Sequence, residues 1–302
     1  MSAVVEQRIA DAAPAASRRR SITLVVGVVL TALIVIIAVV SLFWLPYPLN
    51  DISGGRLDGP SSAHLLGTDR LGRDLLSQLM VGARIALLVG AGAVLLAGVL
   101  GTLIGLVTAF SRPWLDDTLS SALDVVIAFP VLLLAMLVVA VQGASLWSAT
   151  LAIGLAMSAV VARLTRILAR RVLQEQYVTA ARTSGTRLLG IVWHHVLPNI
   201  APTLAVSLAL QFGVAVLAEA SLSYLGLGAP PPNASWGRLL QEAQGTVVTA
   251  PVGAIAPGLA LIALVIGVNF IADGLRDVAD PARRISARGA STRRLTSRKA
   301  TR

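Results

Sequence analysis

Long apolar runs alternate with short polar segments along most of the chain. A helix needs about 20 mostly apolar residues to cross the hydrocarbon core of a bilayer, because each residue adds about 1.5 Å of length. The runs are close to that length, so we predict an all-α membrane protein with about six transmembrane helices. The predicted spans are Ile22–Trp44, Ile85–Phe110, Leu123–Val141, Leu146–Ala162, Ile200–Ala218 and Val252–Ala272.

Basic residues predict the orientation of these spans. Residues 1–21 end in Arg18-Arg19-Arg20 and Ser21, like the start of a signal peptide, but the next apolar run is long enough to span and lacks a convincing cleavage site. We therefore expect a retained first helix with a cytoplasmic N-terminus. Six spans then put 20 basic residues in cytoplasmic segments and five outside, as the positive-inside rule favours. Both termini are predicted to be cytoplasmic.

The spans divide the chain into five parts. They are a cytoplasmic tail (1–21), a first transmembrane helix (22–44), a periplasmic segment (45–84), a core of five spans (85–272) and a basic cytoplasmic tail (273–302). The core includes a cytoplasmic loop at residues 163–199. The periplasmic segment is predicted to contain a helix lying along the membrane, because it has an apolar side. That side consists of Leu71, Leu75, Leu76 and Leu79.

Composition supports a bilayer as the solvent of this chain. Apolar residues make up 56% and charged residues 13% of the 302 residues, and the mean hydropathy is +0.79. A soluble domain carries about a quarter charged residues, so this class is excluded. The net charge of +10 could indicate nucleic acid, but the arginines gather beside the apolar runs. Membrane orientation explains them better, and no nucleic-acid partner is expected.

The residue inventory also excludes several kinds of chemistry. The chain has no cysteine, so disulfides, thiolate zinc sites and cysteine nucleophiles are excluded. Its single lysine is Lys299, in the last four residues, so a phosphate-binding G-x-x-x-x-G-K-[ST] loop is absent. We therefore expect this chain not to hydrolyse ATP by that route.

Small residues and prolines inside the spans predict packing features. Gly101-x-x-x-Gly105 lets two helices approach closely. Pro130 lies inside the third predicted span and Pro257 inside the sixth. Each proline can kink its helix, since it lacks a backbone N–H.

The cytoplasmic segment Gln174–Asn199 has a pattern of helix, glycine break, second helix and proline stop. Ala180 and Ala181 favour a helix and leave a low-relief surface, which another protein's cleft could enclose. Gly185 can adopt the positive φ that ends a helix. Pro198 is predicted to start a new element.

This segment resembles a known loop. The run Tyr177-Val178-x-Ala180-Ala181-x-x-x-Gly185, followed by His195-x-Leu197-Pro198-Asn199, is similar to the "EAA" loop of binding-protein-dependent ABC importer permeases. In that family the loop forms coupling helices that sit in a cleft of the ATPase subunit. Tyr177 stands where a glutamate is typical, which is similar to the peptide-importer branch. The resemblance implies an ATPase-coupling role for Tyr177, Ala180, Ala181, Arg182, Gly185, Leu197 and Pro198. The alternative is an arginine-rich amphipathic loop on the membrane surface.

Three further segments resemble the second (C-type) permease subunit of dipeptide and oligopeptide importers. Leu66–Leu76 resembles the G-T-D-x-x-G-R-D motif before the second span, and Leu222–Gly237 resembles L-S-F-L-G-L-G…P…W-G with Tyr224 in place of Phe. Asn269–Pro281 resembles the closing N-x-x-G-D-x-L-R-D-x-x-D-P, with Ala272 in place of Gly. The first two imply outer loops for docking or gating. The residues concerned are Gly67, Thr68, Asp69, Gly72, Arg73, Asp74, Gly226, Gly228 and Trp236.

Some of these residues also have a purely structural interpretation. Proline and glycine in Leu222–Gly237 predict a rigid, non-helical connector, and Trp236 could be an interfacial anchor instead of a docking residue. Asp273, Arg276, Asp277 and Asp280 are at helical spacing, so local ion pairs are expected at the membrane exit. Glu219 and Gln211 are polar residues near or within a span and are candidates for the substrate pathway.

The resemblance implies a type I ABC importer permease fold in the bacterial cytoplasmic membrane. The chain would form half of a pathway for di- or oligopeptides and work by alternating access. Its partners would be a homologous second permease, two ATPase subunits or domains, an extracytoplasmic substrate-binding protein and the lipid bilayer. ATP and Mg²⁺ would bind the ATPases, with no catalytic residue, cofactor or metal in this chain. Nickel and opine importers of the same subfamily are alternatives, and a membrane receptor or enzyme is one from a different class.

Overall fold

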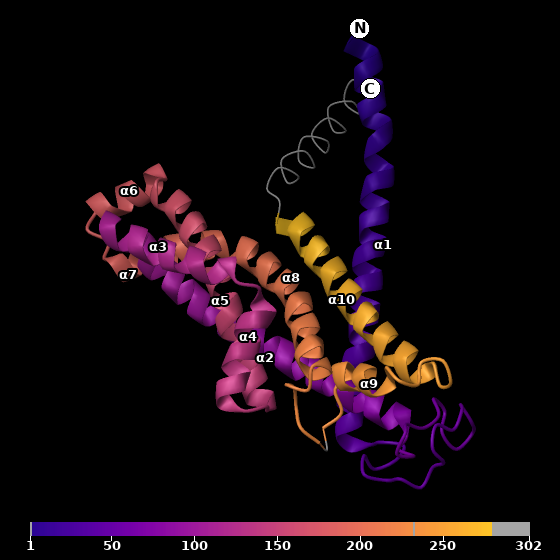
Figure 1. Ribbon diagram of the computed structural model, residues 1–302. Helices are drawn as coiled ribbons and strands as arrows, with labels where there is room; N and C mark the ends of the chain where they lie inside the picture. The colour runs from indigo at the N-terminus through magenta and orange to yellow at the C-terminus, as the bar shows by residue number, and fades with distance from the viewer. Residues whose placement is uncertain (1, 232, 280–302) are drawn as a thin grey trace.

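The computed structural model describes residues 2–231 and 233–279, and every regular element in them is a helix (Figure 1). The helices are α1 (Ser2–Phe43), α2 (Leu75–Phe110), α3 (Pro113–Ala128), α4 (Val131–Gln142), α5 (Leu146–Leu173), α6 (Gln176–Thr183), α7 (Leu188–Ile191), the π-helical turn η1 (Val192–Val196), α8 (Leu197–Tyr224), α9 (Trp236–Ala243) and α10 (Val252–Ala279). Five of the described helical segments are long and apolar enough to cross a membrane, and the bent pair α3–α4 makes up to six. The predicted all-α membrane fold is confirmed.

The third predicted span, Leu123–Val141, is not one helix. It consists of the end of α3 and most of α4, which meet at an angle of 90°. The break falls at Phe129 and Pro130, where Phe129 is extended with φ −85° and ψ 136°. Proline disfavours helical backbone at the residue before it and donates no hydrogen bond of its own, which accounts for the break.

The helix ends also differ from the predicted spans. The helix α2 starts at Leu75 instead of Ile85, so the predicted membrane-parallel helix in the periplasmic segment is wrong. Its leucines from Leu75 onward belong to α2, and Leu71 lies in a turn. The helix α5 continues past Ala162 to Leu173. Several arginines assigned to a loop therefore lie on a helix, because packing against neighbouring helices sustains helical backbone beyond the apolar run.

The main apolar core lies where α2, α5 and α8 meet. The close approach of α2 and α5 depends on Gly101 and Gly105, as predicted. A Cβ at Gly101 would lie 2.5 Å from the Cβ of Val161, and one at Gly105 would lie 2.5 Å from the carbonyl oxygen of Ala162. A second core cluster joins α1, α2, α8, α9 and α10.

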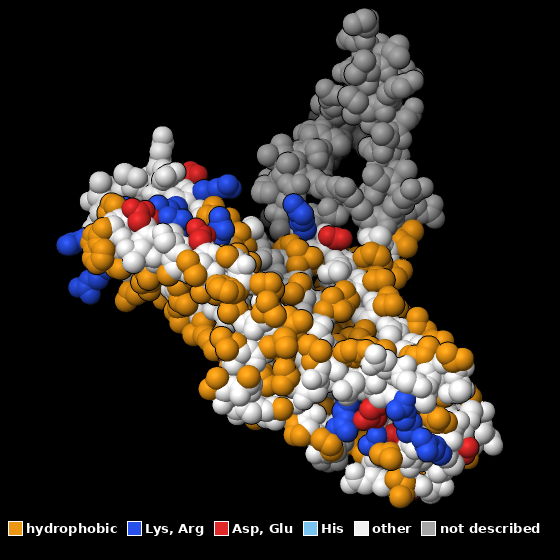
Figure 2. Space-filling view, in the orientation of Figure 1, with side chains coloured by type: hydrophobic (Ala, Val, Ile, Leu, Met, Phe, Trp, Pro, Cys, Tyr) orange, Lys and Arg blue, Asp and Glu red, His pale blue; other side chains and the backbone are white. Residues whose placement is uncertain are grey.

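The bundle has two polar ends. The "α6 end" carries α6, α7 and the C-terminal end of α2, and the "α9 end" carries residues 44–74 and α9 (Figure 1). Helix α1 begins, and α10 ends, on the same side of the bundle as α6 (Figure 1). Charged side chains gather at the two ends, and a mostly hydrophobic surface lies between them (Figure 2). This distribution fits a bilayer around the middle of the bundle.

Candidate functional site

Helix α6 buries one side chain in the bundle. Val178 is fully buried in the main core and is the only buried residue of this helix. Ala180 and Arg182 are exposed, and Ala181 is half-buried. Only Gln174 and Glu175 separate α6 from the end of α5. The helix therefore presents a small-residue surface outward while it stays tied to the end of α5.

Gly185 ends α6 as the sequence predicts. Its φ is +86°, in the left-handed region that costs an L-residue free energy. The N–H of Gly185 donates to the carbonyl of Arg182, and the N–H of Thr186 donates to the carbonyl of Ala181, each at 3.0 Å. These two bonds form a Schellman motif, which satisfies carbonyls that the helix end leaves unpaired.

The return path from α6 is more continuous than predicted. From Leu188 to Tyr224 the chain is a single helical segment of 37 residues, so Pro198 does not stop a helix. It lies in the first turn of α8, directly after the π-helical turn. A π turn changes the local hydrogen-bond pairing, so a missing N–H is tolerated there.

The two parts of the candidate coupling motif, Tyr177–Gly185 and His195–Asn199, contact each other. The Nδ2 of Asn199 donates to the hydroxyl of Tyr177 at 3.1 Å and to the carbonyl of His195 at 2.6 Å. The rings of Tyr177 and His195 lie 5.9 Å apart. Leu197 packs partly buried against the main core, and Pro198 is exposed. Tyr177 of α6 is thus joined to the start of α8 at the α6 end, and an ATPase-coupling role for the candidate residues stays a prediction.

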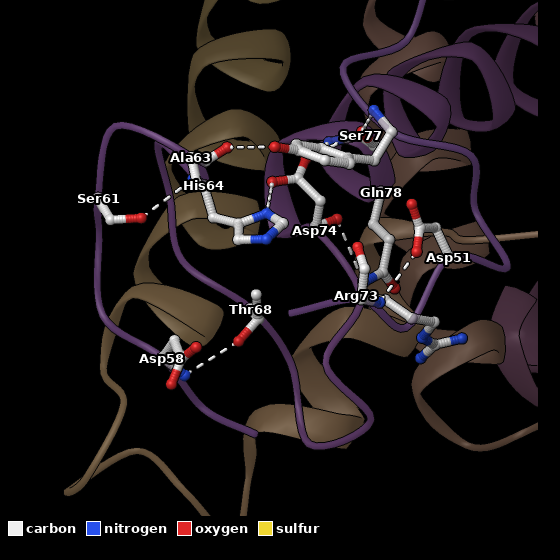
Figure 3. A network of polar contacts seen from close by, with 12 residues as sticks. Asp51, Asp58, Ser61, Ala63, His64, Thr68, Arg73, Asp74, Ser77 and Gln78 are labelled. Carbon is white, nitrogen blue, oxygen red and sulfur yellow. Dashed lines mark hydrogen bonds and ion pairs between the residues drawn. The ribbon is translucent and has the colours of Figure 1, made fainter. Parts of the chain in front are cut away.

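At the α9 end, Asp74 organises the segment 44–74 (Figure 3). Its carboxylate caps α2 by accepting from the backbone N–H of Ser77 at 2.7 Å and from the Ser77 hydroxyl at 2.9 Å. The Nδ1 of His64 lies 3.0 Å from the other oxygen. Tyr47 stacks on His64 with ring centroids 4.5 Å apart. Asp74 is 3% exposed, so it stabilises the start of α2 from inside the protein.

Asp69 closes the turn that precedes Asp74. Its Oδ1 accepts from the backbone N–H groups of Leu71 and Arg73 at 2.8 and 2.9 Å. Its Oδ2 accepts from the Arg73 guanidinium at 2.7 Å and from the Gln78 amide at 3.0 Å. Arg73 also donates to Glu242 at 3.1 Å, which joins this turn to α9.

The remaining residues of this motif are buried as well. Thr68 is 1% exposed, and its hydroxyl bridges the Gly55 carbonyl and the Asp58 N–H at 2.5 and 2.9 Å. Gly67 and Gly72 are buried within the same segment. These side chains build the segment from within, while Arg70 and Leu71 between them are exposed. A direct docking role for the buried residues stays a prediction.

The connector between α8 and α9 is non-helical in its described residues, 225–231 and 233–235, as predicted, although both ends of Leu222–Gly237 belong to helices. Helix α8 ends at Tyr224, and Gly226, with φ +81°, closes a second Schellman motif after it. Gly228 is buried against Ser223, and Trp236 begins α9 instead of extending the connector. The indole N–H of Trp236 donates to the carbonyl of Leu79 at 3.0 Å, and the residue is 1% exposed. Trp236 is therefore a core residue, and its interpretation as an interfacial anchor is wrong.

The two candidate pathway residues lie on α8. Glu219 is 1% exposed, its Oε1 accepts from the Ser223 hydroxyl at 2.7 Å, and its Oε2 has no hydrogen-bond partner among the described residues. The Gln211 amide nitrogen is also buried without a partner in this part of the chain. Glu219 is covered by protein in this conformation, and a substrate role for either residue stays a prediction.

Sequence reasoning missed two partners of these networks. His64 supports Asp74 across ten residues, and Glu242 joins both Arg73 and Arg238. The pairs His64–Asp74 and Arg73–Glu242 have no local sequence signal, whereas Arg238 and Glu242 are four residues apart on one helix. Asp273 and Arg276 are exposed near the end of α10. The side chain of Asp277 and all of Asp280 lie outside the described residues. Within residues 2–231 and 233–279 no group of three His, Cys, Asp or Glu side chains could hold a metal ion.

The sequence signature of binding-protein-dependent transport system inner membrane components matches residues 101–285, which is more than half of the chain. The chain belongs to this family. It is a multi-pass permease subunit of an ABC importer in the bacterial cytoplasmic membrane, and not a catalytic chain. The resemblance noted in the motifs is confirmed. As the family description implies, ATP acts through partner subunits and a substrate-binding protein serves the importer.

Several similar permeases carry names that state their transport systems. The dipeptide transport system permease protein DppC of Alkalihalophilus pseudofirmus is 39% identical over 75% of this chain and 74% of its own length. The glutathione transport system permease protein GsiD of Pectobacterium atrosepticum is 38% identical over 84% of this chain and 86% of its own. A putative peptide transport system permease of Brucella suis is 38% identical over 87% and 88%.

Proposed function

We propose that this permease is the second (C-type) subunit of a peptide importer and that it receives the work of ATP hydrolysis at α6. The peptide class is supported by the names of the similar permeases, which include dipeptide, glutathione and peptide systems. Nickel and opine remain the competing substrates within the subfamily, and no observation on the described residues favours either.

The surface of α6 is the observation that carries the coupling role. A docking helix must present a surface that a partner's cleft can enclose and must pass force to the membrane helices. The surface of helix α6 consists in part of Ala180, Ala181 and Arg182, which are exposed or half-buried. Force can pass to the membrane helices through buried Val178 and through the two-residue link to α5. An amphipathic loop resting on the membrane would instead turn several large apolar side chains outward from this helix.

The proposed cycle is alternating access. ATP and Mg²⁺ bind two partner ATPase subunits or domains, whose closure displaces α6 together with the ends of α5 and α8. Tilting of these helices opens the pathway toward a loaded binding protein, and hydrolysis resets it. A homologous second permease supplies the other half of the pathway. An apolar groove of about 890 Å³ along α2 and α8 supports an apolar neighbour, either that subunit or lipid.

In this proposal the α6 end is cytoplasmic and the α9 end faces the binding protein. Both termini then lie in the cytoplasm, since α1 begins and α10 ends on the side of α6 (Figure 1). The binding protein would contact exposed residues such as Leu65, Arg70 and Leu71. The buried motif Gly67–Asp74 would hold these residues in place and act on docking indirectly.

The test compares two substitutions at one position of α6. Ala181→Glu should leave insertion and complex assembly intact but abolish the stimulation of ATPase activity by the loaded binding protein, because a long charged side chain no longer fits a cleft. Ala181→Ser keeps the surface small and should retain stimulation within about twofold. The assay is ATP hydrolysis by the complex in lipid nanodiscs, normalised to assembled complex. Normal stimulation in Ala181→Glu would refute the coupling role.

Substrate class is tested separately with the wild-type complex and its binding protein. Di- and oligopeptides should stimulate ATP hydrolysis and enter proteoliposomes. Stimulation by nickel chelates or opines, with none by peptides, would refute the peptide assignment and leave the coupling role intact.

A further inference from the structure

Helix α3 is held on the bundle by one buried side chain, Asp116. Asp116 is 2% exposed, and it is the only buried residue of α3. Three large apolar side chains of this helix and its cap are well exposed. They are Trp114 (66%) and Val125 (62%) on α3, and Phe129 (53%) at its C-terminal cap. Apolar burial therefore contributes little to the attachment of this helix, and the contact at Asp116 decides where its first turn lies.

The Asp116 carboxylate binds two arginines on successive turns of α5. Its Oδ1 accepts from Nε of Arg166 at 2.6 Å, and its Oδ2 accepts from a terminal nitrogen of Arg166 at 2.7 Å. A terminal nitrogen of Arg170 lies 2.6 Å from the same Oδ2. A two-pronged arginine–carboxylate contact fixes orientation as well as distance, so it holds α3 at a defined angle to α5.

This contact lies next to the candidate coupling loop. Arg170 is three residues before the end of α5 at Leu173, and α6 begins at Gln176. From α3 the chain continues through the 90° bend into α4, which packs against α5 and α8. A displacement of α6 thus reaches the end of α5 first, and the contact of Arg170 with Asp116 connects that end to α3.

We propose that Asp116 is a positioning residue for coupling, which makes α3 follow the α6 end of α5 when the ATPases move α6. This inference rests on the proposed function and adds the element that carries the movement beyond the loop. The carboxylate is buried, so separating it from the arginines would leave charges without compensation at high cost. The two helices therefore move as one body and do not slide. The second ion pair between them, Asp124 with Arg163 at 3.1 Å, has both side chains more than half exposed and contributes little.

The first test is Asp116→Asn, with Asp117→Asn as the matched control. Replacing Asp116 with asparagine keeps the size of the side chain but removes the charge that both arginines need, whereas Asp117 is exposed. The number of substrates imported per ATP hydrolysed should fall roughly fivefold or more in Asp116→Asn, the lower range of typical coupling between sites. Asp117→Asn should match the wild type. A merely structural Asp116 would lower the yield of complex and leave this ratio unchanged, which would overturn the proposal.

The second test keeps Asp116 and so does not depend on the folding of a variant at that position. The chain has no cysteine, so Asp124→Cys with Arg163→Cys creates a unique exposed pair that a short bifunctional thiol reagent can bridge. Helices that move as one body should import substrate at the wild-type rate when bridged. Loss of import on bridging, restored by reducing a cleavable linker, would overturn the proposal.

The two proposals fail in different ways. If the coupling role of α6 is wrong, Ala181→Glu retains stimulated ATPase activity. If only the role of Asp116 is wrong, Ala181→Glu loses stimulation while Asp116→Asn keeps the wild-type ratio of import to hydrolysis.

Discussion

Replacing Asp74 with alanine should open the segment 44–74 without unfolding the bundle. The carboxylate accepts the N–H and hydroxyl of Ser77 and faces His64 Nδ1, all in a buried setting. Loss of a helix cap costs about 1 kcal/mol. Each buried polar group left without a partner costs about 1–3 kcal/mol. Ser77 and His64 can each regain part of this by local rearrangement, so we expect a total near 3 kcal/mol, at the low end of the sum.

Hydrogen exchange measures this change locally. The reporting amides are those of Leu57, Thr68 and Asp69, which donate to Asp69, Asp58 and Arg73 across the segment. Since about 1.4 kcal/mol corresponds to a factor of ten, Asp74→Ala should speed their exchange roughly 100-fold. The control is Asp58→Ala, whose exposed carboxylate accepts one bond from Gly55. In Asp58→Ala the exchange rates of the same amides should change by no more than roughly twofold, which corresponds to about 0.5 kcal/mol. Exchange in Asp74→Ala within threefold of the wild type would refute the role of Asp74.

Two further predictions concern the packing of the bundle. Gly101→Ala should lower the melting temperature of the purified complex, because the new Cβ would lie 2.6 Å from the Ser158 carbonyl oxygen and overpacking costs about 1–3 kcal/mol. The control Gly258→Ala places its Cβ in open space and gains about 1 kcal/mol of helix propensity, so it should not lower the melting temperature. Equal effects of the two substitutions would contradict the close packing at Gly101. Trp236→Phe should lower the stability of the complex by about 1 kcal/mol, because the hydrogen bond to Leu79 is lost, and Trp236→Ala should lower it by about 3–5 kcal/mol. Thermal unfolding checks this order. An alanine variant as stable as the phenylalanine variant would show that Trp236 is not a core residue.

Features with a local cause were predictable from the sequence. Gly185 ends α6 in the left-handed conformation because a helix end needs a residue without a Cβ, and that need is visible in the residue type. Gly101 and Gly105 also form the predicted close contact, since their spacing puts both on one side of a helix. Hydropathy identified the spanning segments because apolar length is a property of each run alone.

Features that depend on distant partners were not predictable. The end of α5 at Leu173 depends on packing and ion pairs, such as the contact of Arg166 with Asp116 fifty residues earlier in the chain. The burial of Asp69 and Asp74 follows from a tightly folded segment, whereas the resemblance implied an outer loop for docking or gating. From its residue type Trp236 could be an interfacial anchor or a docking residue, but it is buried and bonded to Leu79, 157 residues away in sequence.

The central claim is that α6 is the surface that receives the ATPase. Because the chain has no cysteine, a single cysteine can carry a photoactivated cross-linker at one chosen position of the assembled importer. We predict that Thr183→Cys, exposed on α6, is linked to the nucleotide-binding subunit, and that Ser62→Cys, exposed at the α9 end, is not. Linkage from Ser62 alone, or from neither position in a complex that hydrolyses ATP, would contradict the claim.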